Sequence, residues 1–118
     1  MQVKECYTAM QGDYEGVIGR LLNEERVKKY LFKFLNDKSF ETLRAALSRA
    51  DREEAFRMAH TLKGVSQNLG LTALFQSSNN LTEALRNSMS EEADALFAKL
   101  EEDYHMTIAA ISALQQSE

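Results

Sequence analysis

The residues best suited to chemistry are His60, Lys63 and Gly64, which lie within one stretch of predicted helix. An imidazole presents a nitrogen lone pair near neutral pH, so His60 can take up and release a transferable group. A lysine three residues later lies beside that imidazole on a helix, and its ammonium would stabilise the negative charge of a phosphoryl group. These residues therefore predict phosphoryl transfer to and from His60.

The three residues fall away from the apolar side of their helix. At about 100° per residue, one arc of the segment 52–69 collects its core positions, which are Ala55, Met58, Ala59, Leu62, Val65, Ser66 and Leu69. His60 and Gly64 lie on roughly the opposite side, and Lys63 and Gln67 lie on one flank of that side. A glycine inside a helix costs about 1 kcal/mol relative to alanine. Gly64 therefore indicates that another molecule approaches the backbone beside His60.

The chain resembles the histidine-containing phosphotransfer (HPt) domain in the sequence AHTLKG at 59–64 and NLG at 68–70. The family signature is H-x-L-K-G with a second glycine six residues further on, and the resemblance covers nearly the whole chain. It implies a histidine phosphocarrier of multistep two-component phosphorelays, in which His60 accepts a phosphoryl group from a receiver-domain aspartate and passes it to another receiver. Lys63 would then stabilise the phosphoryl group, and Gly64 would leave room for the incoming aspartyl phosphate.

The resemblance also implies the partners, which are response-regulator receiver domains and a hybrid histidine kinase. The receiver would supply the aspartate and Mg²⁺, so we expect no metal and no other cofactor in this chain. Many family members carry Gln or Glu 22 positions after the histidine, where it hydrogen-bonds the second imidazole nitrogen; here that residue is Thr82, whose side chain is shorter. The residues expected to contact a partner are Phe56, Gln67, Thr82 and Arg86. Phe56 fits equally a receiver contact and a residue at the edge of the bundle.

Capping signals divide the rest of the chain into helices. Asn23 and Asp51 precede acidic residues, as at helix N-termini, and Gly70 is typical of a helix end. Thr72 is expected to cap the next helix, and Ser90, followed by two glutamates, is expected to open the last one.

The apolar spacing predicts the architecture. Stripes at intervals of three and four residues occur in the segments 24–36, 39–49 and 72–85, and one narrow seam runs from Ala93 to Leu114. Short connections favour antiparallel neighbours. We expect an all-α single domain over 1–118, an up-and-down antiparallel bundle of four main helices, with one or two shorter helices within 2–10 and 14–22.

Composition restricts the partners and the location. The 118 residues carry a formal net charge of −4 without a basic patch, which argues against nucleic acid as the main partner. Cys6 is the one cysteine, so the chain has no intrachain disulfide and no thiolate zinc site. No apolar run approaches the roughly 20 residues of a membrane span. We expect a cytoplasmic monomer.

Three other functions are compatible with a small helical domain. A di-iron bundle needs two Glu-x-x-His pairs, and the chain holds one, at Glu102 and His105, which points away from the apolar seam. A histidine kinase needs a glycine-rich nucleotide-binding segment, which these residues lack, so we expect no enzymatic autokinase activity. A non-catalytic adaptor that only binds receiver domains or other signalling partners is the alternative that stays open.

Overall fold

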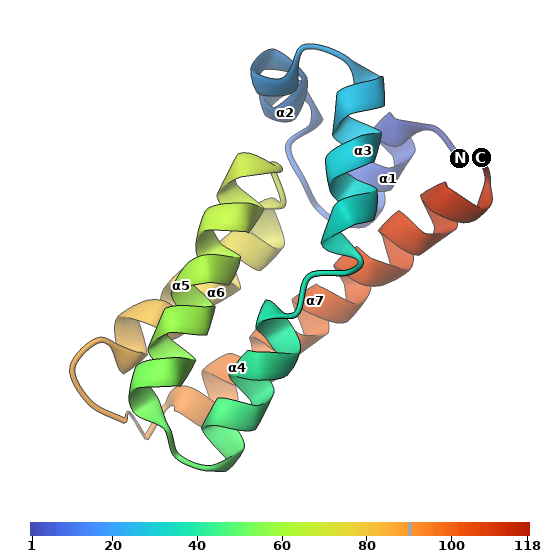
Figure 1. Cartoon of the computed structure of the whole chain (residues 1–118). Helices are drawn as coiled ribbons and strands as arrows, with labels where there is room; N and C mark the ends of the chain where they lie inside the picture. The colour runs from blue at the N-terminus through green and yellow to red at the C-terminus, as the bar shows by residue number, and fades with distance from the viewer. Residues whose placement is uncertain (90) are drawn as a thin grey trace.

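The computed structural model describes residues 1–89 and 91–118, and the regular secondary structure of these residues is entirely helical (Figure 1). The helices are α1 (Val3–Ala9), α2 (Tyr14–Leu21), α3 (Glu24–Phe34), α4 (Ser39–Ser48), α5 (Arg52–Asn68), α6 (Thr72–Leu85) and α7 (Ala93–Gln116). The all-α prediction is confirmed, and both short N-terminal helices lie within the ranges predicted for them.

The arrangement is more elaborate than four main helices with one or two short ones, because the described residues form seven helices. Helices α4, α5, α6 and α7 alternate in direction, whereas α3 runs the same way as α4 and precedes it along α7 (Figure 1). The amides of residues 35–37 bond to carbonyls three residues earlier, and Oδ1 of Asp37 accepts from the amide of Ser39 at 2.8 Å. These tight local bonds end α3 and separate it from α4, which continues in the same general direction.

Two predicted N-caps are confirmed by their hydrogen bonds. The Asn23 side chain accepts from the amide of Arg26 at 2.9 Å, and the Asp51 side chain accepts from the amide of Glu54 at 3.2 Å. Each bond satisfies an amide that has no carbonyl partner in the first turn of its helix.

Three other residues were predicted to mark helix boundaries, and the structure confirms only one of them. Gly70 follows α5 with φ +68°, the left-handed conformation that glycine adopts without strain. The prediction for Thr72 is wrong, because Leu71 occupies the N-cap position and Thr72 is already the first residue of α6. The prediction for Ser90 lies outside the described residues.

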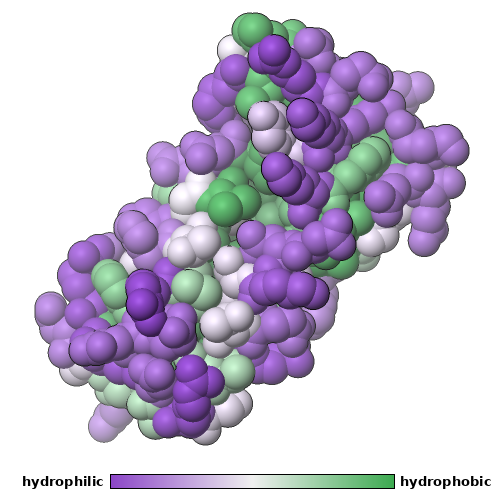
Figure 2. Space-filling model, in the orientation of Figure 1, coloured by the Kyte–Doolittle hydropathy of each residue, from purple (hydrophilic) through white to green (hydrophobic). Residues whose placement is uncertain are grey.

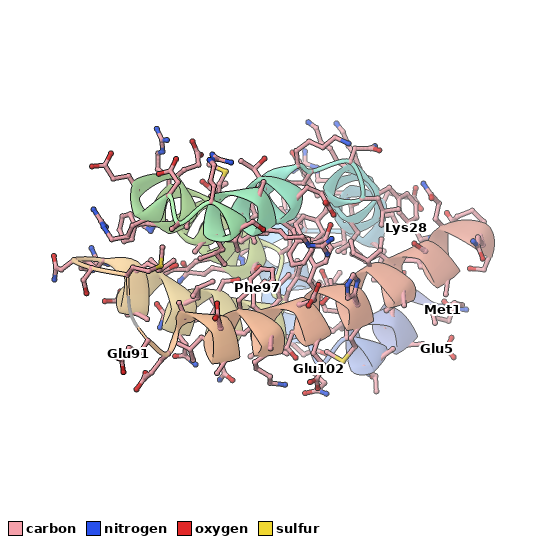
Figure 3. All side chains as sticks on the ribbon, turned by 90° about the horizontal axis from the view of Figure 1, so that it is seen from below. Met1, Glu5, Lys28, Glu91, Phe97 and Glu102 are labelled. Atoms are coloured by element: carbon pink, nitrogen blue, oxygen red, sulfur yellow. The ribbon has the colours of Figure 1, made fainter. Side chains whose placement is uncertain are left out.

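The core forms where α4, α6 and the N-terminal helices meet α5 and α7. Helix α5 packs against both α4 and α6, and α6 packs in turn against α7. The predicted stripe of α6 is fully buried at Leu74, Ser78, Leu81 and Leu85. Along α7, Phe97 points inward and Glu102 lies on the outer side (Figure 3). Cys6 is completely buried, and desolvation raises the pKa of its thiol to about 11, so it behaves as a small apolar core residue.

The carbonyl end of α5 is held by the N-terminal helices. The Tyr7 hydroxyl donates to the carbonyl oxygen of Leu69 at 2.7 Å, and the Arg20 guanidinium donates to those of Gln67 at 3.0 Å and Asn68 at 3.2 Å. These bonds satisfy carbonyls that the helix itself leaves unpaired. The C-terminal end of α5, the helix that carries His60, is therefore fixed by residues that are distant in sequence.

Among the described residues, no helix combines the length and the apolar composition needed to cross a membrane.

Candidate functional site

The sequence-predicted residues of α5 lie on its solvent side. His60, Gly64 and Gln67 are exposed, and Lys63 is half-buried. On the opposite side Ala55, Ala59 and Leu62 are buried, together with Ser66. The predicted arc is therefore confirmed at its centre, whereas Met58 and Val65 lie at its edges and are only half-buried.

Gly64 leaves a bare strip of backbone beside His60. A Cβ atom built at Gly64 would meet no other atom within 4 Å, apart from the helix's own neighbouring backbone. The absence of a side chain therefore does not serve packing within this chain. It leaves the helix open to a close approach from outside, at one turn from the imidazole.

Phe56 lies next to His60 and stacks on it. The two rings are nearly parallel, at 11°, with centroids 6.1 Å apart. Phe56 is half-buried and also packs against the core, so it reaches from the bundle edge to the imidazole. The guanidinium carbon of Arg86, at the end of α6, lies 5.3 Å from the centre of the Phe56 ring. The structure thus brings Phe56, His60 and Arg86 together.

Glu83 is a site residue that the sequence prediction missed. Its carboxylate accepts two hydrogen bonds from Arg86, at 2.8 and 3.2 Å. The bond from Arg86 lowers the pKa of the Glu83 carboxyl, and the nearby positive charge of Lys63 lowers it further. The spacing of Glu83 and Arg86, three residues apart on a helix, is the sequence signal that could have identified the pair.

Thr82 must be removed from the predicted contact surface. Its side chain is completely buried, and its hydroxyl donates to the carbonyl of Ser78 at 2.7 Å. A partner therefore cannot reach Thr82, and its hydroxyl is committed to its own helix. In the described part of the chain no group hydrogen-bonds the His60 imidazole, which instead lies beside the Phe56 ring.

The ends of α5 and α6 are joined beside the site. Nη1 of Arg52 donates to the carbonyl oxygens of Leu85, at 2.8 Å, and Arg86, at 3.1 Å. This contact places the last turn of α6 against the first turn of α5. It thereby sets where the Arg86 side chain can lie relative to Phe56.

A largely apolar groove of about 700 Å³ begins at Val65, directly after Gly64. Figure 2 shows apolar surface between α5 and α3, which line this groove together with the end of α2. Its lining residues are Arg20, Leu21, Tyr30, Lys33, Phe34, Asn36, Asp37, Val65, Asn68 and Leu69. The groove lies on the flank of α5 opposite to Lys63.

No metal centre emerges from the described residues, since they contain no group of three or more His, Cys, Asp or Glu side chains placed to hold an ion. Glu102 and His105 are both exposed on α7, away from its buried seam, as the sequence predicted.

Comparison with protein families places this site in a known class. A model of the Hpt domain matches residues 31–116, which include all of α4 to α7. The chain belongs to the Hpt domain family. Hpt domains are phosphocarriers of two-component phosphorelays rather than catalytic enzymes, and this chain accordingly has a phosphotransfer role. No curated protein and no solved structure gives a significant match to it.

The open space at Gly64 predicts that its role is not in folding. Gly64→Ala should raise the free energy of unfolding by up to ~1 kcal/mol, because alanine favours the helix and its Cβ meets nothing. Gly70→Ala is the matched control: it should lower that free energy by ~1–2 kcal/mol, because φ is +68° and the new Cβ would lie 2.9 Å from the Asp13 carbonyl oxygen. Urea denaturation measures both variants. Equal losses at the two positions would show that the fold itself needs Gly64.

Proposed function

We propose that His60 accepts a phosphoryl group from the aspartyl phosphate of a receiver domain and passes it to the aspartate of another receiver. The observation that carries this proposal is an exposed imidazole beside the bare backbone of Gly64, on a helix held at both ends. An imidazole nitrogen attacks phosphorus, the phosphorus–oxygen bond of the acyl phosphate breaks, and the aspartate leaves as a carboxylate. The reverse sequence delivers the group onward.

Lys63 is proposed to stabilise the charge of the phosphoryl group in flight. It follows His60 by three residues on the same helix, so its ammonium can reach the same space. A phosphoryl group in transfer carries spread negative charge, which fixed cations stabilise. The Mg²⁺ that this chemistry uses would belong to the receiver, so the proposal requires no metal in this chain.

The groove beside Gly64 supports a receiver domain as the partner. It continues the bare surface of α5 as apolar area, of the kind found at the centres of protein interfaces. Arg20, Leu21 and Tyr30 form one wall, and all three lie before residue 31, where the Hpt match begins. We infer that this wall distinguishes the receivers of this protein from others. Gln67 and Phe56, on the exposed side of α5, would lie within the same contact.

The first test uses the two histidines of the chain. Incubation with a phosphorylated cognate receiver should label the native protein with an adduct that is labile to acid and stable to alkali, as a phosphoramidate is. His60→Gln should abolish labelling, whereas His105→Gln should keep it, because His105 lies on the outer side of α7. Labelling that persists in His60→Gln would refute the assignment.

The second test separates a carrier from a non-catalytic adaptor through Lys63. Lys63→Ala should slow transfer about 10- to 100-fold, because a charge-assisted contact to the phosphoryl group is lost, with little change in the receiver Kd. Arg57→Ala is the control: Arg57 precedes His60 by three residues on the other flank and pairs with Glu54 at 2.7 Å. Rapid-quench kinetics and titration calorimetry give the two quantities. Unchanged transfer with weakened binding would favour the adaptor.

A further inference from the structure

We propose that Phe56 is a positioning residue for His60, whose phenyl ring holds the imidazole in the orientation that accepts a phosphoryl group. The inference rests on the proposed function of His60, which it deepens by naming what orients the reactive ring. It starts from the parallel stack of the two rings, 6.1 Å apart at 11°.

The stack leaves the reactive atoms of His60 free. The lone pairs of imidazole nitrogens lie in the plane of the ring. Because the ring is nearly parallel to that of Phe56, these lone pairs point along the phenyl surface and not into it. Phe56 therefore flanks the imidazole in an offset parallel arrangement, and both nitrogens stay available to a donor from solvent. A hydrogen bond, in contrast, would engage one of the two nitrogens.

Among the described residues, no hydrogen bond to the His60 ring competes with this contact. Thr82 is completely buried and its hydroxyl is bonded to the Ser78 carbonyl, so it is not engaged with the imidazole. Without an orienting contact, an exposed imidazole samples several rotamers, and each transfer must wait for a productive one. Stacking on Phe56 reduces the number of rotamers that the imidazole samples.

Phe56 is itself held firmly enough to act on His60. One side of the residue packs against the core, and the Arg86 guanidinium lies 5.3 Å from the ring centre. Glu83 fixes that guanidinium through two hydrogen bonds, and Arg52 bonds to the Arg86 carbonyl. The phenyl ring thus has support from both α5 and α6, which is what a side chain needs to pre-organise a neighbour.

The test measures phosphorylation of His60 by phosphoramidate, a small donor whose phosphorus–nitrogen bond breaks to release ammonia as the new bond to imidazole forms. Phe56→Leu should slow this reaction about 3- to 10-fold, the effect of losing one aromatic pair. Phe56→Tyr keeps the ring and should restore the native rate. Phe97→Leu is the control, because Phe97 is also half-buried and stacked, 5.6 Å from Phe40, but lies on α7. Native rates in Phe56→Leu would overturn the proposal.

A second readout follows the ring directly and needs no phosphorylation. If Phe56 positions the imidazole, the three-bond coupling constants of His60 should report one dominant χ1 rotamer in the native protein. The couplings should average over several rotamers in Phe56→Leu and keep the native values in Phe56→Tyr and Phe97→Leu. Averaged couplings in the native protein would overturn the proposal even if Phe56→Leu failed to fold. Neither readout involves a receiver, so the positioning proposal and the proposed relay function can fail separately.

Discussion

Helix α5 buries one side in the core and exposes the other to a partner. This is possible because hydrogen bonds to other segments hold both of its ends. At its start, Asp51 caps the first turn and Arg52 bonds to the last carbonyls of α6. At its finish, Tyr7 and Arg20 bond to the carbonyls that the helix leaves unpaired. These contacts are made at the ends or behind the helix. The surface around His60 therefore needs no side chain of its own to hold the helix in place.

This arrangement gives a rigid site that is open to a large partner. A reactive group on a regular helix is placed more exactly than one on a loop, because packing fixes the backbone beneath it. The bare strip at Gly64 lets another backbone approach, and the groove from Val65 onward offers apolar surface beside it. On the other flank Lys63 and the pair of Glu83 and Arg86 supply charge. One helix thus separates an electrostatic flank from an apolar one, with the imidazole between them.

The features that could be predicted from the sequence are those that depend on neighbours along the chain. Helical periodicity predicted the exposed face of His60 and Gly64, and local hydrogen-bonding chemistry predicted the caps at Asn23 and Asp51. The left-handed conformation of Gly70 is likewise a local property of glycine. Such signals need no knowledge of the tertiary structure, since they act within about one turn of helix.

The features that sequence reasoning missed depend on how the helices pack against one another. Thr82 was expected to contact a partner, but its hydroxyl bonds to a carbonyl of its own helix, which lets it be buried. Asp103 is likewise buried within the α7 seam, where Lys99 pairs with it at 2.9 Å. The approach of Arg86 to Phe56 depends on how α6 crosses α5, and no spacing within either helix encodes that crossing.

The most direct test of this account is to map where a receiver binds. The amide resonances of the ¹⁵N-labelled protein would be followed during titration with a receiver domain loaded with Mg²⁺ and beryllofluoride, which imitates the aspartyl phosphate. The account predicts that the largest shifts occur at residues 60–68 of α5, with smaller shifts around Glu83 and Arg86. Shifts confined to the outer side of α7 around Glu102, with residues 60–68 unaffected, would contradict it.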